Sequence, residues 1–347
     1  MAGATFNNPV SRRNKVLGEI LAHAVPTEVL GITGDNKKMP KKQGDNIVFR
    51  RWLPYGGTTT SAATINQWSV TVTAHQLQEG VTPTVDSLTP QDITVVMQQY
   101  GCLYMYTDKQ DDLHEDDLPP EMKKQVGERM GLVREMIRYG ALKQCTNLFY
   151  SGGTSRATVA ATISYNLLSK IARSLLANHG SPITSVLSAS PNFNTTGVEP
   201  GFLVFCHTDC EHDIRALPGF KEVVSYGQRK PVHEMEIGSL GRFRFIVSPE
   251  LASIPDSGVA VGSTGLYTTT GSNIDVYPTI VVAESAWGEV ALRGSNSFDY
   301  TNIPVGTKSA ADPLGQRGYT GAKFYSAATV LNNGWMAVAE CGITSLS

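Results

Sequence analysis

The sequence is poor in charged residues for its length. Of its 347 residues, 17% are Asp, Glu, Lys or Arg, whereas soluble proteins usually contain about 25%. The 29 basic and 31 acidic residues give a formal net charge of −2, which argues against a generally basic nucleic-acid-binding protein. The hydrophobic content of 41% argues against wholesale disorder. A large folded chain with so little charge is expected to cover part of its surface, for example with copies of itself.

Cysteine is scarce and long apolar runs are absent. The five cysteines form no C-x-x-C pair, which indicates a reducing compartment rather than a disulfide framework. No stretch of 18 apolar residues occurs, and polar residues interrupt the segment 16–30. We therefore expect neither a membrane span nor a secretory signal, and no membrane partner.

The usual catalytic and phosphate-binding motifs are also missing. There is no G-x-S-x-G, no H-E-x-x-H, no P-loop and no G-x-G-x-x-G. These absences lower the odds of an enzyme, and we assign no catalytic residue and no cofactor.

Two clusters could bind a metal ion, but each has a simpler interpretation. Cys206, His207, Cys210 and His212 offer zinc ligands, yet C-x₃-C is not a usual zinc spacing, and we favour core cysteines beside a short helix capped by Thr208. The acidic run 108–117 lacks the order of a calcium loop, and a solvated or intersubunit acidic face is favoured. No metal site is predicted.

The small net charge hides an uneven distribution. Residues 1–51 contain nine basic and four acidic residues, a net charge of +5, and residues 108–121 contain seven acids and one lysine, a net charge of −6. Opposite charges on separate segments are suited to head-to-tail assembly.

The hydrophobic pattern predicts a long helix over 119–149. Apolar residues recur at helical spacing from Met122 through Val126 and Met130 to Leu148, with charged residues such as Glu135 and Arg138 on the opposite faces. A second helix is expected over 164–178, where Gly180 and Pro182 follow its end, and a short one over 208–217.

Strands are expected where β-branched and aromatic residues alternate or cluster. The clearest are 68–74, within a long hairpin over 55–83, and 92–107. Further strands are expected at 202–206, 243–247 and 279–283. The tail predicts a hairpin of strands 322–331 and 334–340 joined by Asn332-Asn333-Gly334.

At this point the chain resembles a known family. A basic arm, a projecting hairpin and a long helix, in this order, resemble the HK97-type capsid fold, and several segments resemble the major capsid proteins of N4-like tailed phages. These segments are 44–50, 79–83, 98–101, 214–220, 226–231, 236–239, 243–251 and 312–318.

The resemblance implies an α+β fold with five parts. They are an N-terminal arm (1–54), an extended E-loop hairpin (55–88), a peripheral domain (89–182) with the spine helix 119–149, an axial domain (183–304), and a return to the peripheral domain through the C-terminal hairpin (305–347).

The same resemblance implies a structural protein rather than an enzyme. It implies a major capsid protein that assembles into pentamers and hexamers around double-stranded DNA, bound non-specifically. The expected partners are further copies of the chain, a portal protein, a scaffolding protein and a decoration protein. The expected location is the virion, after assembly in the cytoplasm of a bacterial host. The alternatives are a nanocompartment shell of the same fold and, less favoured, a metal-dependent enzyme.

The hairpin cannot bury its apolar face alone, so residues in or beside it are expected to touch neighbouring subunits. The residues for which we predict intersubunit contacts are Arg12, Arg13, Arg50, Arg51, Trp68, Glu79, Asp312 and Arg317.

Overall fold

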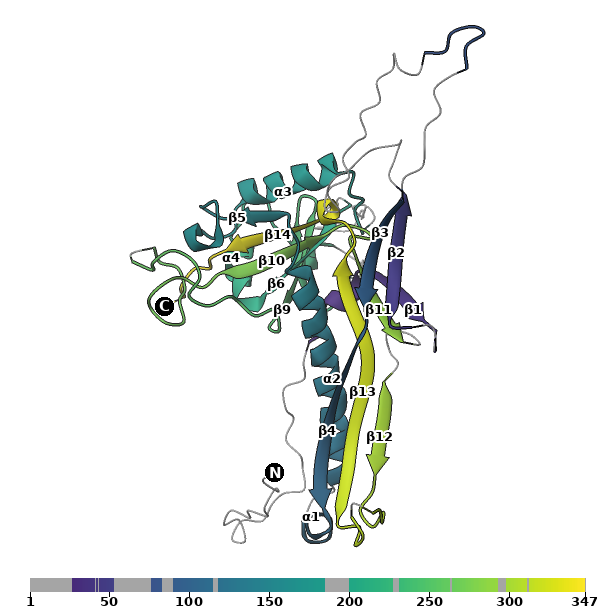
Figure 1. Cartoon of the computed structure of the whole chain (residues 1–347). Helices are drawn as coiled ribbons and strands as arrows, with labels where there is room; N and C mark the ends of the chain where they lie inside the picture. The colour runs from purple at the N-terminus through teal and green to yellow at the C-terminus, as the bar shows by residue number, and fades with distance from the viewer. Residues whose placement is uncertain are drawn as a thin grey trace. The chain divides into compact units, whose positions relative to one another are not determined.

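The computed structural model of the chain contains mixed α and β structure (Figure 1). It describes residues 27–40, 42, 44–52, 76–82, 90–114, 118–184, 200–226, 231–262, 264–292, 298–310 and 312–346. The predicted strand 68–74 lies outside the described residues, as do Arg12, Arg13 and Trp68.

The chain divides into two compact units. The first draws on Gln98–Arg134 and Asn296–Tyr325, and the second on Thr27–Met97, Glu135–Ser295 and Ser326–Ser347. Helix α2 (Leu118–Leu142) and strand β13 (Arg317–Val330) each have residues in both units.

The second unit is built on a seven-stranded sheet. Its strands are, in spatial order, β5 (Leu148–Tyr150), β14 (Met336–Cys341), β10 (Tyr277–Val282), β6 (Phe202–His207), β9 (Phe243–Ser248), β8 (Glu236–Leu240) and β7 (Lys221–Glu222). Strands β6, β9 and β10 confirm three sequence predictions within two residues at each end.

Both faces of this sheet are covered, which explains why β6 is a continuous apolar run. Phe202 and Val204 pack with helix α3 (Tyr165–Ala177) and helix α4 (Glu211–Arg215). Leu203 and Phe205 point to the other face and pack with Trp287. Helix α3 confirms the predicted second helix, with Ser164 as the N-cap residue whose side chain accepts a hydrogen bond from the Leu167 N–H.

Short 3-10 turns connect these elements. They are η2 (Leu30–Ile32), η5 (Arg156–Thr158), η6 (Thr208–Cys210), η7 (Val223–Tyr226) and η8 (Asn333–Trp335). The predicted cap at Thr208 is wrong: η6 and α4 follow His207, whose Nδ1 accepts from the Asp209 N–H at 3.1 Å.

The N-terminal strand of the second unit joins a different sheet. Strand β1 (Asp35–Met39) pairs in parallel with β11 (Trp287–Leu292), and β11 pairs antiparallel with the end of β13. The chain reaches β1 through Thr33, whose hydroxyl oxygen accepts from Trp287 Nε1 at 3.0 Å.

Helix α2 buries two residues that the sequence places on its solvent side. Glu135 is 0% exposed and Arg138 4%. Arg138 donates to Glu289 Oε2 from Nε at 3.0 Å and from Nη2 at 2.8 Å, and its Nη1 lies 3.3 Å from Glu135 Oε2. The second oxygen of Glu135 accepts the backbone N–H groups of Val29 and Leu30, both at 2.8 Å. Burial is possible because every charge has a partner.

Helix α2 also ends seven residues before the predicted limit of 149. The chain turns after Leu142, and Leu148–Tyr150 forms β5, in which Leu148 pairs in parallel with Val338 of β14. Cys145 is buried in the turn, so the apolar residues that continued the helical period beyond Leu142 serve a turn and a strand instead.

The first unit packs the first part of α2 against a sheet (Figure 1). Strand β13 pairs there with β4 (Gln98–Thr107) and with β12 (Asp299–Ile303). Val126 and Met130 of α2 are buried, and Arg134 stacks over the ring of Phe298 at 5.3 Å. Helix α1 (Asp108–Leu113) follows β4 and begins with a capping box formed by Thr107 and Gln110.

Two strand predictions need correction. The predicted strand 92–107 is two strands, β3 (Pro90–Val96) and β4, which separate at Met97 and belong to different sheets. The predicted C-terminal hairpin is wrong as well, because β13 and β14 also lie in different sheets and are joined by η8. The Asn332 side chain accepts from the Gly334 N–H there, so the residues that suggested a hairpin turn instead carry the chain between sheets.

The buried Arg138 cluster gives the first prediction. Arg138→Met removes the guanidinium from between Glu135 and Glu289 and leaves two buried carboxylates without the cation that pairs them, so we expect a loss of about 3–5 kcal/mol in the free energy of unfolding. Urea denaturation followed by circular dichroism measures it. Arg215→Met is the matched control, because its ion pair with Glu211 is exposed and contributes less than about 1 kcal/mol. Equal losses in the two variants would contradict the prediction.

Candidate assembly surfaces

Strands β2 (Asn46–Trp52) and β3 form a two-stranded antiparallel sheet, here called the β2–β3 ribbon. The register runs from Asn46 opposite Val96 to Trp52 opposite Pro90. It flanks the segment 53–89, of which only residues 76–82 are described. A two-stranded sheet of this kind is marginally stable in water without a further packing surface.

The ribbon has one face that other parts of its unit cover. Along β2 and β3, exposed and less exposed residues alternate. Phe49 lies on the covered face and approaches Gly288 so closely that a Cβ there would lie 3.1 Å from its ring. Arg51 shares this face and donates to Gln91 Oε1 from Nε at 2.9 Å and from Nη2 at 2.7 Å. Burial lowers the pKa of Arg51.

The opposite face of the ribbon is apolar and open to solvent. Val48, Trp52 and Val96 are 51%, 57% and 53% exposed. Between them, Arg50 Nε donates to Asp92 Oδ1 at 2.7 Å and Nη2 to Oδ2 at 2.8 Å. This hydrogen-bonded pair raises the pKa of Arg50 and lowers the pKa of Asp92. The exposed face therefore combines large apolar side chains with a charged pair that neutralises itself, a composition that suits a surface buried on association.

Of the residues on this exposed face, the sequence named only Arg50 as a contact residue, because Arg51 lies on the covered face. Val48, Trp52, Asp92 and Val96 were not among the predicted contact residues. The sequence does contain a signal for a two-faced strand, because residues 46–52 alternate between two faces at period two. Arg50 and Asp92 also have opposite charges. The pairing of the two strands, across about forty residues of intervening chain, could not be derived from the pattern.

Glu79 lies in the short described stretch 76–82. The stretch is exposed throughout, and the Val81 N–H donates to the Gln78 carbonyl at 3.2 Å to close a turn. Gly80 has φ +76° in this turn, a conformation that favours glycine. The structure thus presents Glu79 at the surface.

Asp312 lies in a turn of the first unit that precedes β13, and Arg317 is the first residue of that strand. The Asp312 carboxylate accepts from the Arg317 N–H at 2.9 Å and lies 3.5 Å from Arg317 Nε. Burial acts to raise the pKa of Asp312, but the backbone N–H groups of Gln316 and Arg317 outweigh it, and the pKa lies below its usual value. The two residues therefore pair with each other within one chain, and the Arg317 side chain is partly exposed.

The cysteine and histidine cluster is divided between core and surface. Cys206 and Cys210 are buried in the main apolar cluster, as predicted for core cysteines. Burial raises the pKa of both thiols. In the part of the chain that the structure describes, no three His, Cys, Asp or Glu side chains gather as a metal ion would require. None of the described helices is long and apolar enough to cross a membrane.

Comparison with known proteins supplies context for these surfaces. No family model matches the sequence. The chain is 22% identical over 262 residues to the major capsid protein of Pseudomonas phage KPP21. The match covers 70% of this chain and 65%, less than two thirds, of that relative.

Solved structures resemble the chain along its whole length. The capsid of Ralstonia phage GP4 matches with a TM-score of 0.65 at 13% identity, over 100% of this chain and 99% of that chain. The capsid of Helicobacter pylori bacteriophage KHP30 matches with a TM-score of 0.60 at 11% identity, over 99% of both chains. The chain has the fold of phage capsid proteins.

The capsid fold confirms the fold class expected from the sequence. The α+β HK97-type fold is the fold class that the resemblance in the sequence implies, and the solved structures similar to this chain are phage capsids. The narrower likeness to the N4-like group and the five domain boundaries stay predictions.

The placement of cysteines in this capsid fold gives a second prediction. Four thiols are buried, and burial raises the pKa of Cys145 to about 11 and that of Cys341 to about 12. Cys102 on β4 is half-buried. Since the thiolate is the reactive form, a thiol reagent at pH 8 should label Cys102 first in the folded protein and all five cysteines after denaturation. Mass spectrometry of the labelled peptides measures this, and early labelling of Cys206 or Cys210 would contradict it.

Proposed function

We propose that the chain is the major capsid protein of a tailed bacteriophage and assembles into pentamers and hexamers of an icosahedral shell around double-stranded DNA. The observation that carries the proposal is the capsid fold, matched over 100% of the chain, together with a relative named as a major capsid protein. These similar proteins come from phages, which favours a virion over a nanocompartment.

The proposed partners follow from this role. They are other copies of the chain, a portal protein, a scaffolding protein and a decoration protein, with DNA bound non-specifically. The net charge of −2 suits a shell that does not grip its DNA tightly. Assembly would take place in the cytoplasm of the bacterial host, and the mature location would be the virion. The role requires no catalytic residue and no cofactor.

The predicted contact residues stand as proposals within this role. Arg50 and Arg51 lie on the β2–β3 ribbon, Glu79 is exposed in the stretch 76–82, and Asp312 and Arg317 form an ion pair in the first unit. The exposed face of the ribbon adds Val48, Trp52 and Val96, because an apolar face on a two-stranded sheet needs a partner surface. In a shell, that surface is a neighbouring subunit.

The function is tested by assembly of the purified protein. The full chain, expressed with and without the neighbouring genes of its phage, should form closed particles of uniform diameter in electron microscopy and sediment far faster than a monomer. A monomer or small oligomer under all conditions, combined with catalytic turnover, would overturn the proposal.

The ribbon face gives a more specific prediction. The double substitution Val48→Ser and Trp52→Ser removes much of the exposed apolar surface but little of the monomer's core, so the folded monomer should persist while shell formation falls about tenfold or more. Thr94→Ser, on the same face, is the control and should assemble normally. Sedimentation velocity gives the assembled fraction, and circular dichroism checks the fold. Normal shells from the double variant would show that this face lies outside the interface.

A further inference from the structure

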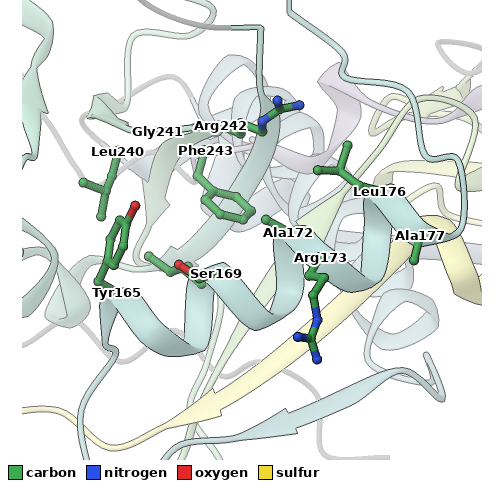
Figure 2. Close-up of a pocket in the computed structure, with 11 residues that line it drawn as sticks. Tyr165, Ser169, Ala172, Arg173, Leu176, Ala177, Leu240, Gly241, Arg242 and Phe243 are labelled. Atoms are coloured by element: carbon green, nitrogen blue, oxygen red, sulfur yellow. The ribbon is translucent and has the colours of Figure 1, made fainter.

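A groove lies between helix α3 and the turn that joins β8 to β9, both in the second unit. It has a volume of about 700 Å³. One wall is the α3 face from Tyr165 to Ala177, and the other is the turn Leu240–Phe243. Figure 2 shows the Phe243 ring pointing from the turn toward α3.

The floor of the groove is apolar. Leu168, Ala172, Leu240 and Phe243 line it. Leu176 and Tyr165, which also line the groove, are exposed large side chains on a helix whose Leu167, Leu168, Ile171 and Leu175 are buried. An open apolar surface of this kind indicates contact with another protein segment rather than with nucleic acid, which is held mainly through its phosphates.

The charges at the groove have one sign. Arg173 and Arg242 are exposed and are the charged residues among the described residues that line it. In Figure 2, the Arg242 side chain extends outward from the turn and the Arg173 side chain leaves α3 on the side away from the turn, so the two guanidinium groups flank the groove without pointing into it. Helix α3 itself contains no acidic residue. The groove therefore favours a segment that is both apolar and acidic.

Helix α1 of the first unit has this composition. It carries Asp108, Asp111 and Asp112, no residue in it is buried, and Leu113 at its end is 62% exposed. It lies within the run 108–121, whose net charge is −6.

We propose that the groove beside α3 receives helix α1 of a second copy of this chain. Leu113 would lie on the apolar floor, and Asp111 and Asp112 would face Arg173 and Arg242. The two surfaces differ, so the contact is heterologous, and a heterologous contact whose rotation closes forms a ring, as pentamers and hexamers require. This inference rests on the proposed shell function.

The experiment exchanges the charges. The groove variant is Arg173→Glu with Arg242→Glu, the helix variant is Asp111→Arg with Asp112→Arg, and the exchanged variant carries all four substitutions. Each full-length protein is purified, checked for folding by circular dichroism and thermal unfolding, and tested for shell formation over a range of concentrations. Lys170→Glu is the matched control, because it reverses a charge on α3 outside the groove lining.

The groove and helix variants should each raise the concentration needed for shell formation about tenfold or more, since like charges would then oppose each other. The exchanged variant should recover most of that loss, and Lys170→Glu should resemble the wild type. A folded Leu113→Ser variant should also assemble less well.

Two outcomes overturn the inference while the shell function stands. One is wild-type shells accompanied by normal assembly of the groove and helix variants. The other is a groove defect that the exchanged variant does not repair, which would show that the groove contacts a segment other than α1. If the wild-type chain forms no shells under any condition, the shell function and this inference both fail.

Discussion

The buried guanidinium of Arg138 is the constraint on which the second unit depends. It lies between Glu135 and Glu289, which are themselves almost fully buried. Through these carboxylates it connects α2 to β11 and to the backbone of Val29 and Leu30. Gly31 passes so close that a Cβ there would lie 2.7 Å from Arg138 Nη1. Since an isolated buried charge costs several kcal/mol, this network favours one path for the chain that leads into β1, a path that apolar contacts alone would specify less sharply.

The Arg138 network also shows which features of the fold could not be predicted from the sequence. The period of α3 and the apolar run of β6 are local signals, and each was interpreted correctly. The buried positions of Glu135 and Arg138 were not, because their partners Val29, Leu30 and Glu289 are more than a hundred residues away in the sequence. The same limit explains the false hairpin at 332–334: the turn residues were recognised, but which sheet each strand joins depends on partners such as Glu289 opposite Ala328 and Thr279 opposite Ala339.

The candidate assembly surfaces could be predicted from the sequence only in part. The sequence indicated that residues near the hairpin would face neighbours, and Arg50 and Glu79 are indeed at the surface. It did not reveal the exposed face made by Val48, Trp52 and Val96, which exists only when β2 and β3 pair in register. The low charge content has a related explanation. In the proposed shell, apolar and neutral polar residues occupy surfaces that would carry charged residues in a monomer surrounded by water.

The ribbon and the α3 groove would specify association in different ways. On the ribbon, Arg50 and Asp92 neutralise each other within one chain, so a partner needs only a complementary apolar shape, and the contact can form at slightly different angles. At the groove, Arg173 and Arg242 are both positively charged and would pair with carboxylates of another chain. Such contacts are directional and are screened by salt beyond about 8 Å at physiological ionic strength. A shell that places one chain in rings of five and of six needs both kinds of contact, because charge pairing selects the partner surface while an apolar, neutral face tolerates the change in angle.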